Sequence, residues 1–220
     1  MRTVKAAIFD LDGTLNDTLE AIAYCTNKTL AEFGLDSVPI ERFKTFVGDG
    51  ARNQINRVCA YLCVKDEDLI NRIYERYLQI FKVDCMYKVH PYDGIPELLK
   101  ELKERGIKLG VLSNKPDMMT QKTIEDVFGT EVFDRVRGQF DGFPIKPAPD
   151  GALALAKDFN AEPYECIYLG DTNTDMKTGK SAGMYTVGVL WGFRDEKELR
   201  ETHADAIIEH PLQVLKLIDT

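Results

Sequence analysis

An apolar run that ends in an acidic hexapeptide constrains the fold of this chain more than any other feature. The run spans residues 4–9, and Asp10-Leu11-Asp12-Gly13-Thr14-Leu15 follows it directly. On a strand, residues i and i+2 point the same way, so a strand that ends here aims both carboxylates into one crevice. Open α/β sheets bind ligands in that crevice, at the carboxyl ends of their strands. The motif therefore predicts a functional site at the end of a buried first strand.

Later apolar runs end in polar residues in the same way. Residues 107–112 precede Ser113-Asn114-Lys115, residues 166–169 precede a segment that holds Asp171 and Asp175, and a Lys146-Pro147-Ala148-Pro149 loop lies between them. A further apolar run covers residues 184–189, and helical patterns separate these runs, at 95–105, 116–128, 149–159 and 174–182. Continuous apolar strands alternating with helices predict an α/β fold with a doubly wound, Rossmann-like parallel sheet.

One long stretch breaks this alternation. Residues 18–85 carry only helical patterns, over 18–34, 40–46, 50–64 and 66–84. Gly34 and Pro39 mark the end of the first of these helices. We expect a four-helix unit inserted over residues 17–85, hinged near 15–18 and 83–92, in a larger unit built from residues 1–16 and 86–220.

The four polar blocks, in this order, resemble the haloacid dehalogenase superfamily of phosphatases. The Ser113-Asn114-Lys115-Pro116 segment, the Ala182-Gly183-Met184 turn and residues 188–194 resemble its phosphoglycolate phosphatase-like branch. The resemblance covers nearly the whole chain. It implies that residues 1–16 and 86–220 form a Rossmann-like catalytic core and that residues 17–85 form a helical cap domain inserted after the first strand.

The resemblance also implies roles for the charged residues. Asp10 would be the nucleophile that forms an acyl phosphate, and Asp12 would protonate the leaving oxygen and then activate water. Lys146 would neutralise charge on Asp10 and the phosphate. Mg²⁺ would be the cofactor, because it prefers oxygen ligands. Its predicted ligands are Asp10, the backbone carbonyl of Asp12, and Asp171, with Asp175 in the outer sphere of the metal site.

Substrate contacts are predicted at three places in the sequence. Ser113 and Asn114 would donate hydrogen bonds to the phosphoryl oxygens, and Gly13 and Thr14 would line the same turn. On the cap, the Gly48-Asp49-Gly50 loop would face the site, with Arg52 as a candidate substrate contact. Two residues stay open: Lys115 could contact a substrate carboxylate or lie in solvent, and Asn16 stands at the hinge, where relatives often carry an aliphatic residue.

The leading interpretation is a magnesium-dependent phosphatase that acts on a small phosphomonoester, with 2-phosphoglycolate as one candidate. The alternatives on the same scaffold are a sugar phosphomutase of the β-phosphoglucomutase type and a pyrophosphatase. The mutase type carries a histidine where this chain has Ile22, which makes a mutase the less favoured interpretation. A receiver-type signalling module would have no helical lid. A catalytically inactive interaction protein would be expected to lack one of the residues that carry the chemistry, and none of them is missing from this chain.

Composition narrows the partners. The 220 residues carry a net charge of −8, which argues against nucleic-acid or anionic-membrane binding. No apolar stretch is long enough to span a bilayer, and the first strand begins without a signal-peptide pattern. Five cysteines without paired spacing indicate reduced thiols, and Cys59 and Cys63, four residues apart on an expected helix, are expected to be buried as small apolar residues instead of binding a metal. We therefore expect a cytoplasmic enzyme with a small-molecule phosphate ester as its partner, either a monomer or a homodimer.

Overall fold

A six-stranded parallel sheet forms the centre of the larger part of the molecule. The computed structural model describes residues 3–218. The strand order is β5-β4-β1-β6-β7-β8, and every neighbouring pair is parallel. The strands are β1 (Ala6–Phe9), β4 (Lys108–Pro116), β5 (Arg135–Gln139), β6 (Cys166–Gly170), β7 (Tyr185–Val189) and β8 (Ala206–Ile208).

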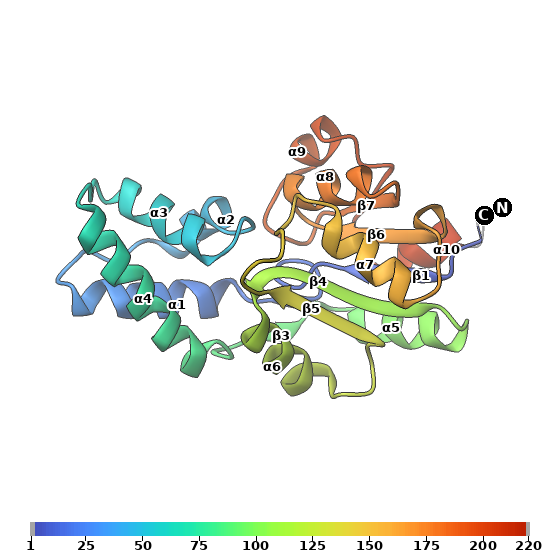
Figure 1. The fold of residues 1–220 in the computed structure, drawn as a ribbon, viewed down its shortest axis with the longest axis horizontal. Helices are drawn as coiled ribbons and strands as arrows, with labels where there is room; N and C mark the ends of the chain where they lie inside the picture. The colour runs from blue at the N-terminus through green and yellow to red at the C-terminus, as the bar shows by residue number, and fades with distance from the viewer. Residues whose placement is uncertain (1–2, 219–220) are drawn as a thin grey trace.

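Helices cover both faces of this sheet (Figure 1). Ala7 and Phe9 of β1 pack in one core with α5 (Ile95–Glu104), α6 (Asp117–Phe128) and α10 (Val214–Ile218). Ala6 and Ile8 pack in a second core with α7 (Asp150–Asp158) and with Ala182 and Met184, which follow α8 (Asn173–Ser181). Because both sets of alternating β1 side chains are buried, the strand is apolar throughout. The predicted doubly wound α/β sheet is confirmed.

Four helices inserted after β1 form the other part of the molecule, seen at the left of Figure 1. They are α1 (Leu19–Glu32), α2 (Ile40–Phe46), α3 (Ala51–Tyr61) and α4 (Glu67–Asp84). Their buried apolar residues form a core of their own. The two chain segments that join this helical unit to the sheet pair with each other, as the antiparallel strands β2 (Asn16–Asp17) and β3 (His90–Pro91). The proposed domain boundaries at 16/17 and 85/86 stay a prediction.

The structure differs from the sequence prediction at the edges of the elements. β5, β8, α9 (Glu196–Glu201) and α10 were not predicted, because their sequences are short or mix polar with apolar residues. β4 runs to Pro116, so Ser113-Asn114-Lys115 lies within the strand instead of after it. Cys63 is exposed, in a left-handed conformation just after α3, unlike the four buried cysteines.

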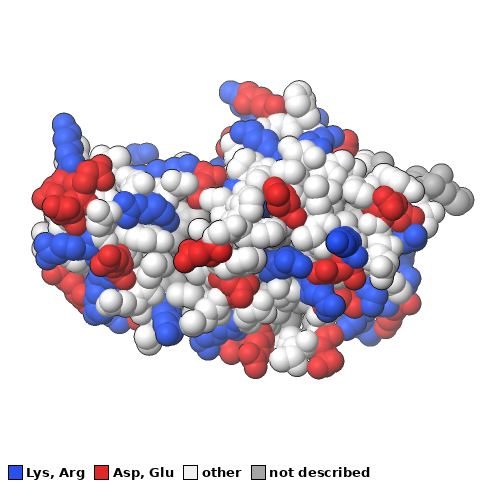
Figure 2. Space-filling model, in the orientation of Figure 1, with Lys and Arg blue, Asp and Glu red and all other residues white. Residues whose placement is uncertain are grey.

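The surface carries both signs of charge. On the face drawn in Figure 2, basic and acidic side chains are interspersed over both parts of the molecule. In residues 3–218, no helix combines the length and the apolar character that crossing a bilayer requires.

Candidate active site

The site begins where β1 ends, at the carboxyl edge of the sheet. Asp10 follows β1 directly and is buried, and its backbone N–H donates to the carbonyl of Leu169 at the end of β6. Gly13 turns the chain with φ of +90°, and a Cβ there would collide with the carboxylate of Asp171. Glycine is therefore required at position 13, because this turn must approach Asp171 closely.

Lys146 joins two of the buried carboxylates. Its Nζ lies 2.7 Å from Oδ1 of Asp10 and 2.7 Å from Oδ1 of Asp175. All three side chains are at most 8% exposed. The Lys146–Pro147 peptide bond is cis. Pro147 and Pro149 belong to the loop that places the single ammonium of Lys146 between two carboxylates.

Asn114 fixes the backbone of that lysine. Its Oδ1 accepts from the Lys146 N–H at 2.9 Å, and its Nδ2 donates to the Lys146 carbonyl at 3.0 Å and to the Gly48 carbonyl at 3.2 Å. Both amide hydrogens are therefore engaged, and a bond from Asn114 to phosphate would have to replace one of them. Ser113 is placed differently: its Oγ accepts from the Lys115 N–H, which leaves its own proton to donate into the cavity.

Hydrogen bonds also hold two further carboxylates of the site in place. Asp171 accepts from the Thr14 hydroxyl at 3.1 Å and from the Phe193 N–H at 2.8 Å. Asp175 is the third residue of α8 and forms a capping box with the N-cap residue Thr172, so that its Oδ2 accepts from the N–H and hydroxyl of Thr172. Thr14 therefore points at a predicted metal ligand, and its predicted contact with substrate has no counterpart among these bonds.

Asp10, Asp171 and Asp175 form a cluster that fits a cation. Each offers one carboxylate oxygen, and the three oxygens lie within 4.8 Å of one another. Burial and then the charge of Asp175 raise the pKa of Asp171 to about 7. Burial and then Asp175 also raise the pKa of Asp10 well above its usual value, although Lys146 opposes this. Three clustered buried acids with one ammonium between two of them leave excess negative charge, which a bound cation would balance.

The pKa of Lys146 reflects the same excess of negative charge. Burial alone would lower the pKa of Lys146, but the carboxylates of Asp10 and Asp175 hold that pKa well above its usual value. The lysine therefore stays charged, and it acts as a fixed positive group beside Asp10.

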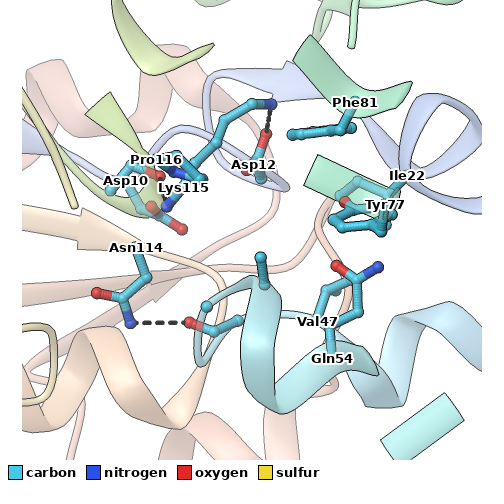
Figure 3. A pocket seen from close by; sticks show the side chains of 14 residues that line it. Asp10, Asp12, Ile22, Val47, Gln54, Tyr77, Phe81, Asn114, Lys115 and Pro116 are labelled. Atoms are coloured by element: carbon cyan, nitrogen blue, oxygen red, sulfur yellow. Dashed lines mark hydrogen bonds and ion pairs between the residues drawn. The ribbon is translucent and has the colours of Figure 1, made fainter. Parts of the chain in front are cut away.

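Asp12 forms an ion pair with a second lysine, Lys115. Its Oδ1 lies 2.9 Å from Nζ of Lys115, whose side chain is only 2% exposed. Figure 3 draws this pair beside the ring of Phe81, which comes from α4. The Lys115 ammonium lies 5.0 Å from the centre of that ring. Lys115 thus belongs to the site, and the alternative that it lies in solvent is wrong.

These side chains open on a small cavity between the sheet and the helical unit (Figure 3), of about 40 Å³. From the sheet side it is lined by Asp10, Asp12 and residues 113–116. The helical unit contributes the side chains or backbone of Ile22, Val47, Gly48, Gly50, Ala51, Gln54, Tyr77 and Phe81. Gln54, Tyr77 and Phe81 were not predicted to line a site, because nothing in their local sequence pattern distinguishes a cavity wall from a helix core.

Arg52 lies elsewhere. Its guanidinium donates to Asn71 at 2.5 Å and stacks over the ring of Tyr74, 5.0 Å from the ring centre. It is not among the residues that line the cavity. Ala51 and Gln54 occupy the inward face of α3, and Arg52 is rotated away from that face. Its role as a substrate contact stays a prediction, which this arrangement does not support.

The Gly48-Asp49-Gly50 loop touches the core directly. Asp49 accepts from the Thr174 hydroxyl at 2.6 Å, and its other oxygen pairs with Arg57. Arg194, on the core, donates to the carbonyls of Lys44 and Val47 on the helical unit. Together with the Asn114–Gly48 bond, these contacts hold the helical unit against the end of the sheet.

The chain is similar to known proteins over nearly its whole length. The model of the family described as haloacid dehalogenase-like hydrolase matches residues 7–189. A phosphoglycolate phosphatase from Aquifex aeolicus is 30% identical over 220 residues, covering 98% of this chain and 97% of that protein. An N-acetylmuramic acid 6-phosphate phosphatase from Pseudomonas aeruginosa is 29% identical over 218 residues, with 98% and 95% covered.

A solved structure has the same fold over the whole chain. A Lactobacillus delbrueckii protein, described provisionally as a phosphoglycolate phosphatase, superposes with a TM-score of 0.93 at 29% identity, with 99% of each chain covered. The chain therefore belongs to the haloacid dehalogenase-like hydrolase family. Within it, the chain is a phosphoric monoester hydrolase of the phosphoglycolate phosphatase-like kind.

Proposed function

We propose that this protein is a magnesium-dependent phosphatase that hydrolyses a small phosphomonoester through an aspartyl phosphate on Asp10. The observation that carries the proposal is the placement of Asp10. Its carboxylate is buried, held by Lys146, and grouped with Asp171 and Asp175 at the mouth of a cavity. A carboxylate can attack phosphorus only if a nearby positive charge offsets its repulsion from the phosphoryl oxygens.

In the first step, an oxygen of Asp10 attacks phosphorus and the bond from phosphorus to the ester oxygen breaks. Asp12 gives its proton to that leaving oxygen, so the alcohol departs neutral. In the second step, water attacks phosphorus, Asp12 takes its proton, and the bond to Asp10 breaks to release phosphate. Lys146 stays beside Asp10 throughout, and Ser113 donates to a phosphoryl oxygen.

Asp10, the backbone carbonyl of Asp12 and Asp171 would hold Mg²⁺, which supplies charge neutralisation when bound. Asp175 has a different position, because one of its oxygens is engaged by Lys146 and the other by Thr172. We assign it to the outer sphere, where it orients Lys146. Thr14 and the Phe193 N–H orient Asp171 in the same way.

We further propose that residues 17–85 act as a cap domain that closes over the substrate. The loop contacts of Asp49 and Gly48 support this role. The small cavity between the sheet and the helical unit favours a short ester such as 2-phosphoglycolate over a sugar phosphate. Ile22 lines that cavity without a proton to exchange, which argues against a sugar phosphomutase.

A panel of phosphate esters tests the proposal. Purified protein should release phosphate from 2-phosphoglycolate with Mg²⁺, should stop when a chelator is added, and should recover when Mg²⁺ is restored. Glucose 6-phosphate and pyrophosphate should be poorer substrates. Asp10→Asn should bind but not turn over, because a carboxamide forms no acyl phosphate. Release of phosphate in excess chelator, or by Asp10→Asn, would contradict the mechanism.

A further inference from the structure

Two buried lysines stand in the site, and they differ in how many of their protons are used. Lys146 donates to two carboxylates at 2.7 Å each. Lys115 is as deeply buried, yet Asp12 is the one hydrogen-bond acceptor that its ammonium meets among residues 3–218. An ammonium has three protons to donate. Lys115 therefore keeps donor capacity that no group of the described chain takes up.

The surroundings of Lys115 make it energetically costly for its ammonium to lack further hydrogen-bond acceptors. The side chain is 2% exposed, so bulk water does not reach the ammonium freely. The ring of Phe81, on α4, covers one side of it, and an aromatic face attracts a cation without accepting a directed hydrogen bond. Ile22, Val47 and Tyr77 line the same cavity. A buried charge in such surroundings favours a second anionic partner.

That partner must come from the cavity, because Lys115 lines it together with Asp10 and Asp12. We propose that Lys115 is the residue that sets substrate specificity, by binding a carboxylate on the leaving group of the phosphate ester. The inference rests on the proposed phosphatase function and narrows its substrate class to phosphomonoesters of short hydroxy acids. Since the Lys115 ammonium lies 2.9 Å from the Asp12 carboxylate that serves the leaving oxygen, the substrate carboxylate must lie within a few bonds of the phosphoryl group.

This proposal differs from the role predicted for Arg52. The guanidinium of Arg52 already has Asn71 and Tyr74 as partners and does not line the cavity. The cationic group available to a second substrate anion thus comes from the core strand β4, and the helical unit supplies the aromatic wall that encloses it.

A competing explanation is that Lys115 only positions Asp12. Loss of the ammonium would then lower turnover of every ester by the same factor, because Asp12 serves the leaving oxygen of each. A role in recognition lowers turnover of carboxylate esters much more than that of neutral ones. The ratio of kcat/KM for two matched esters separates the explanations, since any common loss cancels.

The experiment compares 2-phosphoglycolate with 2-hydroxyethyl phosphate, which replaces the carboxylate by a neutral alcohol. The wild type should prefer 2-phosphoglycolate by about 10- to 100-fold in kcat/KM, the range of one charge-assisted hydrogen bond. Lys115→Met should bring this ratio close to one. Lys100→Met, which removes an exposed lysine of α5 paired with Glu104, is the matched control and should keep the ratio of the wild type.

A binding measurement covers a variant whose turnover is too low to compare. In the Asp10→Asn background, calorimetry should find that Lys115→Met weakens binding of 2-phosphoglycolate about 10- to 100-fold and changes binding of 2-hydroxyethyl phosphate little. Lys115→Gln, which keeps a polar side chain, serves if the methionine variant does not fold. An unchanged ratio, or equal weakening for both ligands, would overturn the proposal and leave the phosphatase function standing. Failure of the wild type to hydrolyse either ester would instead contradict the proposed function.

Discussion

Replacing Lys146 by methionine removes the only positive charge that joins Asp10 to Asp175 among the described residues. The three groups are at most 8% exposed, so the carboxylates that remain cannot recover their hydration. Removal of one partner from a buried ion pair costs about 3–5 kcal/mol. For a chain of this size, that corresponds to a fall in Tm of roughly 6–20 °C.

Thermal unfolding followed by circular dichroism, in the presence of a chelator, measures this loss. The matched control is Lys122→Met, which breaks an exposed pair with Asp126 that spans one helical turn. Such a pair is worth about 0.3–0.5 kcal/mol, so the control should move Tm by no more than about 2 °C. Adding Asp175→Asn to Lys146→Met should recover part of the loss, because one unpaired charge is removed. A Lys146→Met protein as stable as the control would refute the account of a single ammonium balancing buried acids.

Two other substitutions test the charge and polarity of the site. Asp171→Asn keeps an oxygen that can accept from the Phe193 N–H and gains an amide that can donate to the Thr14 hydroxyl oxygen, but it removes one of the three clustered charges. It should therefore abolish stabilisation by Mg²⁺ while raising the stability of the metal-free protein. Burial raises the pKa of Asp171 from its usual 3.8 to about 7, so between these two values the folded wild type holds a proton that the unfolded chain has already lost. The wild type therefore loses stability as the pH rises through this interval, and denaturant titrations should find the advantage of Asp171→Asn growing from about pH 4 to pH 7 and level above it. Asn16 is fully buried with neither side-chain polar atom hydrogen bonded, so Asn16→Leu should stabilise the protein by about 1–2 kcal/mol, and a lower Tm in a thermal scan would contradict that.

The sequence predicted the centre of the sheet because its strands are buried on both faces. β1, β4, β6 and β7 read as continuous apolar runs, and the polar groups that follow them converge because parallel strands end at the same edge. The edge strands β5 and β8 have no such signal. Arg135-Val136-Arg137-Gly138-Gln139 alternates charged and apolar residues, and its strand identity comes from pairing with β4.

Side-chain direction was the part that sequence order predicted least well. Arg52 was chosen for its nearness to the Gly48–Gly50 loop, yet the buried residues Ala51, Ile55 and Val58 mark a different face of α3. A residue one position from Ala51 is rotated by about 100° around the helix, so this periodicity already placed Arg52 outside. The burial of Lys115 had no comparable signal. It depends on Phe81 and Tyr77 from a helix more than thirty positions earlier in the chain.

The central claim is that phosphate is carried on Asp10 during turnover, and chemical trapping tests it most directly. Borohydride reduces an acyl phosphate to an alcohol, so an aspartyl phosphate becomes homoserine. Wild-type protein turning over 2-phosphoglycolate with Mg²⁺, quenched with borohydride and digested for mass spectrometry, should contain homoserine at position 10. The same treatment without substrate should leave Asp10 intact. Homoserine at another aspartate, or an intact Asp10 throughout rapid turnover, would contradict the account.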